Sequence, residues 1–245
     1  MSKNFHDNNA IYGSPKITRK LHEEGFRVGE KTVGQLMRAH HLRSQAMGKF
    51  KVQTTDSNHD FPLAPNWLNQ HFDVCTKPNQ VWVNDITYIR TRQNTVYLAS
   101  VLDLFTRKIV GWQLGNRMRV ALVSSALDKA YEAQKPDKGL IHHSDRGSQY
   151  ASADYRKKLK EYHMIRSMSR RGNCYDNACI ESFHSILKRE LIYGGRTFQT
   201  QKEAENQLFR YIEFFYNRKR IHSKLGHLSP DRFESLYYSN LKQAN

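Results

Sequence analysis

Three acidic residues of the chain interrupt or follow apolar runs, and their side chains could together do chemistry. Asp85 lies inside the apolar stretch 81–89, Asp145 follows another such stretch, and Glu181 lies in a segment with helical periodicity. Thirty-five residues separate Asp145 from Glu181. Carboxylates of this kind hold Mg²⁺, which prefers oxygen ligands and keeps several waters. A pair of such ions can activate a water or hydroxyl and stabilise the leaving oxygen of a phosphodiester.

Each acid also has an ordinary structural interpretation. An isolated Asp in a strand often ends a ladder or caps a helix, and Asp145 could be a turn residue. Glu181 and Lys188 could lie on a solvated helix surface, the commonest place for such residues. Asp103 and Asp176 are the rival acids, although Asp176 is predicted to be the N-cap of the helix that carries Glu181.

The composition indicates a basic, globular chain. Its 245 residues are enough for one sizeable core and a small appendage, and the formal net charge is +16. Such charge favours a polyanionic partner, because neutralised phosphates supply most non-specific affinity for nucleic acid. Charge alone does not distinguish DNA from RNA or from anionic lipid. No run approaches the ~20 apolar residues of a membrane span, and no signal peptide opens the chain.

The three cysteines do not form a recognisable structural set. Cys75, Cys174 and Cys179 contain no C-x-x-C pair and no even disulfide framework. We therefore expect reduced thiols in a cytoplasmic protein.

The N-terminal part of the chain is predicted to form two short helices between Ser14 and Leu42. Ser14 is the expected N-cap before Pro15, and Gly25 is expected to end the first helix. The apolar spacing fits a helix-turn-helix DNA-binding segment and equally any small helical pair. The outer faces of these helices carry Lys16, Arg19, Lys20, Lys31 and Arg38.

The stretch 46–78 is predicted to be a linker, because prolines and polar residues interrupt any period. Trp67, Leu68 and Phe72 suggest that part of it packs onto the next domain. From Val81 onward, apolar runs predict three strands and then alternating helices and strands. Strands are expected at 81–89, 96–104, 109–114, 140–142 and 165–168, and helices at 120–133, 152–162, 175–191 and 204–216, with a helical restart near Pro230.

The acids and their surroundings resemble the catalytic domain of the DDE transposases and retroviral integrases, in which two Asp and one Glu hold divalent metal. The spacing from Asp145 to Glu181, with Lys188 seven positions after the Glu, is similar to one branch of that group. The surrounding sequence narrows the resemblance to the OrfB transposases of bacterial insertion sequences of the IS-three family. The segments that carry it are 12–17, 36–38, 82–88, 142–150, 173–183, 216–217, Arg220, His222, 225–226 and Pro230.

The resemblance implies an α/β fold, the RNase H-like fold of integrase catalytic cores, in which helices flank a mixed sheet. It also implies a small N-terminal helical segment of the helix-turn-helix type. We accordingly expect a DNA-binding segment at 1–45, a linker at 46–78 and a catalytic domain at 79–240 that includes the C-terminal helices.

The same resemblance implies a DNA transposase catalytic subunit, with metal-dependent cleavage at the insertion-sequence ends and strand transfer by the 3′-OH. Asp85, Asp145 and Glu181 would be both the catalytic and the metal-binding residues, with two Mg²⁺ or Mn²⁺ ions when DNA is bound. No zinc is expected. Retroviral integrases carry an N-terminal His-His-Cys-Cys zinc module, whereas here Cys75 comes well after the histidine pair at 40–41.

The expected partner is double-stranded DNA, both the terminal repeats of the element and the target. The chain would act as a homo-oligomer on DNA in the bacterial cytoplasm, associated with the nucleoid and not with a membrane. Family members are usually made by frameshifting from an upstream frame, OrfA, so a fusion or complex with that partner is also expected. The candidate DNA-binding residues are Lys188, Arg166, Arg170, Arg171, Lys16, Arg19, Lys31, Arg38, Arg218 and Arg220.

A second interpretation keeps DNA binding without catalysis, as in a regulator or inhibitor of transposition. The three acids discriminate between the two, because a pure DNA binder has no reason to place carboxylates against phosphates. A structure-selective nuclease of the same fold is a weaker alternative. The roles of His142, His143, His184 and Asn177 stay open, with packing or DNA contact expected for the histidines before metal binding.

Overall fold

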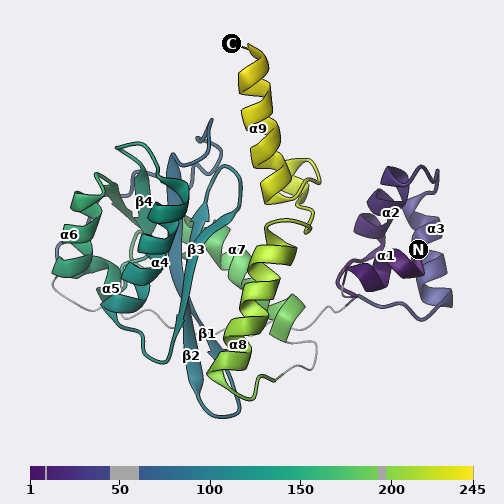
Figure 1. Ribbon diagram of the computed structural model, residues 1–245, viewed down its shortest axis with the longest axis horizontal. Coiled ribbons are helices and arrows are strands. Elements are labelled where there is room, and N and C mark those ends of the chain that lie inside the picture. Colours follow the sequence, from purple (N-terminus) through teal and green to yellow (C-terminus); the bar gives the residue numbers. More distant parts are fainter. Residues whose placement is uncertain (9, 45–60, 193–196, 245) are drawn as a thin grey trace. The chain divides into compact units, whose positions relative to one another are not determined.

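The computed structural model shows two compact units (Figure 1). It describes residues 1–8, 10–44, 61–192 and 197–244. One unit is Met1–Lys51 with Ser185–Arg196, and the larger one is Val52–His184 with Thr197–Asn245. None of the helices in the described ranges is both long enough and apolar enough to cross a membrane.

The described N-terminal residues form three helices, α1 (Ser2–Asp7), α2 (Ser14–Glu23) and α3 (Glu30–Ala39). The two helices expected between residues 14 and 42 are therefore confirmed, whereas α1 is too short to show a period in the sequence. Apolar side chains at helical spacing pack together in this unit. The buried ones are Phe5, Tyr12, Ile17, Leu21, Val33 and Met37.

The predicted start of α2 is wrong by one residue, and its predicted end is confirmed. The helix begins at Ser14, with Gly13 as its N-cap and no side-chain cap bond. The prediction of Ser14 as N-cap is wrong, because Gly13 already supplies the extended residue and the Ser14 carbonyl accepts from the Thr18 hydroxyl at 2.8 Å. Gly25 follows the helix at φ +87°, a conformation that favours glycine, so the predicted stop is confirmed.

A five-stranded mixed sheet in the order β3-β2-β1-β4-β5 forms the centre of the larger unit. β1, β2 and β3 pair antiparallel, while β4 and β5 run parallel to β1. All five predicted strands are confirmed to within two residues, because their β-branched and aromatic residues suit a buried pleated surface. The strands are β1 (Val81–Arg90), β2 (Thr95–Asp103), β3 (Ile109–Gly115), β4 (Ile141–Ser144) and β5 (Ile165–Met168).

Helices cover both faces of this sheet (Figure 1). The helix predicted at 175–191 is present, but its first turn is 3₁₀ and its last is π-helical. An unpredicted short helix, α5, precedes α6. The elements are α4 (Val120–Gln134), α5 (Ser148–Ala151), α6 (Ala153–Glu161), η1 (Cys174–Asn177), α7 (Ala178–Leu187), η2 (Lys188–Ile192), α8 (Gln201–Phe209), η3 (Arg210–Tyr216), η4 (Ser223–Leu225) and α9 (Pro230–Ala244).

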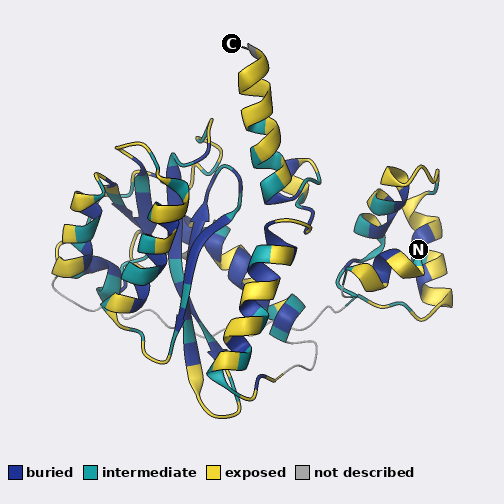
Figure 2. Ribbon diagram, viewed as in Figure 1, coloured by how far each residue is buried: buried dark blue, intermediate teal, exposed yellow. Residues whose placement is uncertain are grey.

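The main core lies between α4 and one face of the sheet (Figure 2). Trp82 and Ile86 of β1 point into it. Gly111 of β3 allows α4 to approach closely, because a Cβ at this position would lie 2.4 Å from the Ala126 carbonyl oxygen. Side chains alternate along a strand, so Asp85 points to the opposite face, which α7 covers.

The C-terminal part begins with α8, which continues directly into the π-helical η3. The backbone hydrogen bonds of a π-helix join residues five apart, and the Phe209 and Phe214 ring centroids are 5.6 Å apart. The helical restart expected near Pro230 is confirmed by α9. The predicted apolar stripe is also confirmed, because its members are all buried: Ala204, Leu208, Tyr211, Ile212, Phe215 and Tyr216.

Candidate active site

Asp85 lies in the middle of β1, where its side chain is half-buried. Its Oδ1 accepts from the Ile86 backbone N–H at 2.8 Å. Its Oδ2 lies 3.3 Å from Nδ1 of His184, which comes from α7. Both oxygens of this carboxylate are therefore oriented by the protein.

Asp145 directly follows β4, which pairs with β1. The parallel register pairs Asn84 with Ser144, so Asp85 and Asp145 are the residues that follow this pair in the two chain segments. Neighbouring strands lie about 4.8 Å apart. Asp145 Oδ1 accepts from the Gly147 N–H at 2.9 Å, which fixes the carboxylate at the start of the following turn.

Glu181 lies in the first turn of α7 and is exposed at the surface. Its pKa is raised from 4.5 to about 7 by partial burial and then by the negative charges of Asp85 and Asp145. The contribution of both charges to this shift agrees with three acids that lie near one another.

The donor chemistry of this region fits a divalent cation. All three groups are carboxylates, and Mg²⁺ takes one or two carboxylates while keeping several waters. The structure does not bring them together as a finished cage: within the described ranges, no three His, Cys, Asp or Glu side chains lie close enough to hold one ion. An open carboxylate set of this kind needs waters or phosphate oxygens to complete a coordination shell.

Replacing Glu181 by Gln should stabilise the metal-free protein at pH 8 and leave its stability near pH 4.5 almost unchanged. A folded pKa of about 7 above the usual 4.5 means that Glu181 contributes stability below pH 4.5 and loses it as pH rises through 7. After allowance for solvent exposure, the gain at pH 8 is about 1 kcal/mol, or roughly 2–4 °C in Tm. Thermal unfolding in EDTA at both pH values measures it.

A control variant and a measurement with added Mg²⁺ complete this test. Glu161→Gln, at the exposed end of α6, should show no such pH dependence. Added Mg²⁺ should stabilise the wild type more than Glu181→Gln, because a ligand stabilises the state that binds it. Equal or lower stability of Glu181→Gln at pH 8 would show that the three carboxylates do not repel one another.

Asp176 is a buried anchor and not the predicted N-cap. It lies within η1, whose N-cap is Asn173, and its side chain is fully buried. Arg170 donates to it from the guanidinium at 2.8 and 3.0 Å and from the backbone N–H at 2.7 Å. Asn66 and Gln70 of the linker donate at 2.9 Å each. The prediction failed because these donors come from distant parts of the chain.

Part of the described stretch 61–78 therefore does pack onto the unit that contains the sheet, as expected. Leu68 is buried, and the Trp67 backbone N–H donates to Ser167 Oγ at 3.0 Å. The Trp67 ring itself is exposed.

Cys75 and Cys179 are free thiols, and burial raises the pKa of Cys75 to about 12.

The two histidines before Asp145 are buried in the sheet. His142 contacts the Tyr155 hydroxyl at 2.8 Å, and His143 lies 2.8 Å from Ser167 Oγ and 3.2 Å from Ser169 Oγ. Burial lowers the pKa of His142 to about 3 and that of His143 to about 4. Both are neutral packing residues.

The basic residues after β5 occupy different environments. Arg170 holds Asp176, and Arg166 donates to the Pro62 carbonyl at 3.1 Å. Arg171 is exposed, and Lys188 is the half-buried first residue of η2. Two of the three arginines therefore have structural partners within the unit that contains the sheet.

The remaining basic candidates lie in the N-terminal helices and near the C-terminus. Lys16 lies 4.8 Å from the Tyr12 ring centroid, and Arg19 is 3.8 Å from Glu23. Arg220 is buried and its guanidinium lies 6.0 Å from the Tyr216 ring, which corrects the expectation of a DNA-facing position. Its long side chain packs within the C-terminal helical segment. The exposed members are Arg19, Lys31, Arg38 and Arg218.

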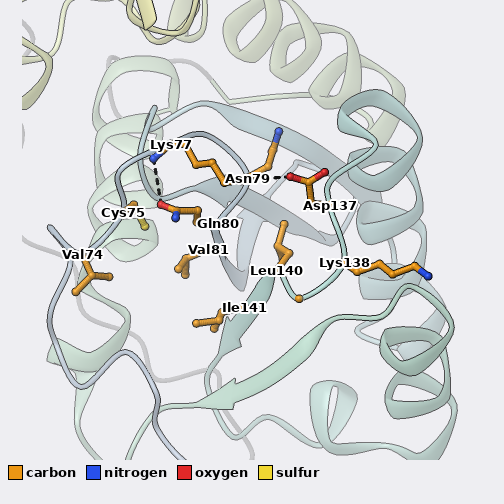
Figure 3. Close-up of a pocket in the computed structure, with 11 residues that line it drawn as sticks. Val74, Cys75, Lys77, Asn79, Gln80, Val81, Asp137, Lys138, Leu140 and Ile141 are labelled. Carbon is orange, nitrogen blue, oxygen red and sulfur yellow. Dashed lines mark hydrogen bonds and ion pairs between the residues drawn. The ribbon is translucent and has the colours of Figure 1, made fainter. Parts of the chain in front are cut away.

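A pocket of about 320 Å³ opens where the inner strands β1 and β4 begin (Figure 3). Gln80, Val81 and Ile141 line it at the beginning of β1 and β4. Lys77 lies 3.2 Å from Asp137 beside it. None of the three acids lines this pocket, so it is not their substrate site.

Sequence reasoning missed Ser100, which lies directly opposite Asp85 in the β1–β2 register. Ser100 is buried, and its hydroxyl lies 3.2 Å from Nε2 of His184. The predicted strands contain both residues, but only the register places them side by side.

Comparison with known proteins identifies the domains. One integrase core domain model matches residues 75–174, and a second matches residues 181–236. An HTH-like domain model matches residues 1–50.

Curated relatives match nearly the whole chain. The Insertion element IS600 uncharacterized 31 kDa protein of Shigella sonnei is 46% identical over 227 residues, which cover 93% of this chain and 82% of that protein. The transposase for insertion sequence element IS904 of Lactococcus lactis is 44% identical, with 94% and 90% covered. Transposase InsF for insertion sequence IS3A of Escherichia coli is 42% identical, with 91% and 77% covered.

Solved structures show the same fold at low identity. A chain of the simian T-cell lymphotropic virus intasome in complex with PP2A regulatory subunit B56 gamma superposes with a TM-score of 0.56 at 15% identity, covering 89% of this chain and 70% of that one. The HTLV-2 integrase catalytic core domain in complex with magnesium gives 0.50 at 15% identity, covering 65% and 98%. The expected integrase-type fold is confirmed. The chain therefore belongs to the IS3 (IS-three) family of insertion-sequence transposases, and it combines an HTH-like domain with an integrase core domain.

Proposed function

We propose that this chain cleaves DNA at the ends of an insertion sequence and joins the resulting 3′-OH to target DNA. The observation that carries the proposal is the placement of Asp85, Asp145 and Glu181. Asp85 and Asp145 follow paired residues of neighbouring strands, and both charges act on Glu181. Carboxylates that repel one another on an accessible edge favour a bound cation, and a pure DNA binder gains nothing from them beside phosphates.

The three carboxylates would hold Mg²⁺ or Mn²⁺, two ions when DNA is bound. Their all-oxygen chemistry suits either ion, and the magnesium of the HTLV-2 integrase core supports the choice. When bound, such ions lower the pKa of an attacking water and neutralise charge on the phosphate.

The chain's own residues fix where those carboxylates point. The Ile86 N–H and His184 orient Asp85, and the Gly147 N–H orients Asp145. Glu181, with its pKa of about 7, gives up its proton readily when positive charge arrives. These contacts position the acids before DNA binds, which lowers the reorganisation needed in the reaction.

The DNA would be held by basic side chains of both units. The net charge of +16 and the HTH-like domain support binding to double-stranded DNA, including the element's terminal repeats and the target. An oligomer on DNA, a complex or fusion with the OrfA product, and action at the bacterial nucleoid are parts of the same proposal. The proposed contacts are Lys16, Arg19, Lys31, Arg38, Arg166, Arg170, Arg171, Lys188 and Arg218.

The direct test is incubation with a labelled duplex that carries the ends of the element. In Mg²⁺ the chain, with the OrfA product where needed, should nick at the element boundary, leave a 3′-OH and give joined products. EDTA should abolish both steps. Binding without cutting in any metal would favour the regulator interpretation, and cutting without joining at any sequence would favour the nuclease.

A further inference from the structure

A buried histidine links Asp85 to the neighbouring strand. His184 Nδ1 lies 3.3 Å from Asp85 Oδ2, and Nε2 of the same ring lies 3.2 Å from Ser100 Oγ. His184 is 5% exposed and Ser100 is 1% exposed. The two ring nitrogens therefore each contact a polar group in a place that solvent scarcely reaches.

The fold places these three side chains together. Asp85 and Ser100 are directly opposed in the antiparallel β1–β2 register, so their side chains point to the same face of the sheet. His184 lies three positions after Glu181 on α7, which puts both on one face of that helix. His184 consequently ties the helix that carries Glu181 to the strand that carries Asp85.

The chemistry of the three groups sets the direction of the hydrogen bonds. An ionised carboxylate only accepts, so the tautomer of His184 with its proton on Nδ1 is the one that suits the 3.3 Å contact with Asp85. In the neutral ring Nε2 then accepts, and the Ser100 hydroxyl donates to it. In this arrangement Ser100 donates to His184, and the Nδ1 proton of His184 faces the accepting carboxylate of Asp85.

The same order of Asp, His and Ser atoms occurs in serine hydrolases, but the surroundings exclude that role here. A nucleophilic serine needs an exposed hydroxyl. Ser100 lies in the middle of β2, buried under α7, where no substrate can reach it. The series of hydrogen bonds therefore orients the acid at its far end.

We propose that His184 is a positioning residue that fixes the Asp85 carboxylate, and that Ser100 fixes the ring of His184. The Ile86 N–H holds Oδ1 and His184 holds Oδ2, so rotation of the carboxylate about its Cβ–Cγ bond is restrained from both sides. The inference rests on the proposed function, because a fixed Asp85 matters for binding a divalent cation. Hydrogen-bonded partners of metal ligands typically contribute about 10–100-fold to metal affinity.

Two isosteric substitutions separate positioning from packing. In His184→Asn the amide nitrogen takes the place of Nδ1 and can still donate to Asp85. In His184→Gln the amide nitrogen takes the place of Nε2 and reaches toward Ser100 instead. If the site needs only a polar side chain of moderate size, the two variants should behave alike.

The measurement is binding of Mn²⁺ to the purified full chain without DNA, followed by electron paramagnetic resonance of the free ion. Mn²⁺ affinity should fall about tenfold in His184→Gln and stay within about threefold of wild type in His184→Asn. Ser100→Ala should lower it about threefold, and the double variant Ser100→Ala with His184→Gln should be no worse than His184→Gln alone. His71→Asn, at an exposed position, serves as the control.

The other outcomes test two separate proposals: the positioning role of His184 and the metal site at Asp85. Equal Mn²⁺ affinity for the Asn and Gln variants would overturn the positioning role of His184. Asp85→Asn in the same assay tests the proposed function itself, since unchanged Mn²⁺ binding there would remove the metal site from Asp85. If His184→Gln does not fold by circular dichroism, Ser100→Ala decides, and its unchanged Mn²⁺ affinity would likewise overturn the inference.

Discussion

Strand cleavage should fall about a thousandfold or more when Asp85 or Asp145 is replaced by Asn, or Glu181 by Gln, while DNA affinity stays within about twofold. Each substitution keeps the shape of the side chain and removes the charge that would hold a cation at the scissile phosphate. Loss of one well-placed electrostatic group costs about 10²–10³-fold in other enzymes, and groups that act as a unit lose more. Cleavage of a labelled element end in Mg²⁺ and gel-shift titration of the same duplex measure the two quantities.

Lys188→Ala, unlike the three acid substitutions, should weaken DNA binding. We propose that this lysine contacts DNA, so its removal should weaken binding to element ends by a few-fold and reduce the dependence of affinity on salt concentration. Asp154→Asn, at an exposed position in the first turn of α6, is the matched control for the acid substitutions and should change neither strand cleavage nor DNA affinity. Loss of DNA binding in all three acid variants would instead indicate that these residues support the fold, and unchanged binding by Lys188→Ala would exclude its contact.

The prediction also separates the enzyme from a regulator of transposition. For a protein that only binds DNA, removing Asp85 or Glu181 would reduce repulsion of phosphates and strengthen binding. Burial, and then the negative charges of Asp85 and Asp145, raise the pKa of Glu181. Stronger DNA binding in these variants without any wild-type cleavage would therefore favour the regulator.

The strands, and the elements on which the three acids lie, could be predicted because their signals are local. The apolar run around Asp85 and the apolar stretch before Asp145 each lie within about ten residues, and such runs specify buried strands. The position of Glu181 in a helix follows from periodicity in the same way. That these elements form an integrase-type fold came from resemblance, which the comparisons with known proteins confirm.

The side-chain contacts that orient Asp85 could not be predicted, because they join residues that are distant in the sequence. Ser100 is an ordinary strand residue until the β1–β2 register places it opposite Asp85. His184 is one of several histidines near the acids, and only the packing of α7 on the sheet distinguishes it from His142 and His143. The buried Arg220 was misplaced for a related reason: a basic cluster in sequence does not reveal which side chain points inward.

The contacts of Asp176 with Asn66 and Gln70 also join distant residues, so they could not be predicted from the sequence. Substitution of Asp176 is expected to have the largest effect on stability. Replacing it by Ala should destabilise the unit that contains the sheet by about 2–4 kcal/mol, because several hydrogen bonds to a buried carboxylate would be lost. The loss would leave Arg170, Asn66 and Gln70 without the carboxylate that they share. Urea unfolding followed by tryptophan fluorescence measures it, with Arg170→Ala expected to cost less because Arg170 is exposed.

The pH dependence of that effect tests its cause. Hydrogen bonds from the Arg170 guanidinium are the largest reason that the pKa of Asp176 lies well below its usual range. A carboxyl group with a lowered folded pKa contributes stability above its unfolded pKa of about 3.9 and loses it as pH falls toward the folded pKa. The difference in unfolding free energy between wild type and Asp176→Asn should therefore be constant from pH 5 to 8 and shrink below about pH 4. A difference that persists unchanged to pH 3 would mean that shape, and not charge, holds the linker to the loop before Glu181.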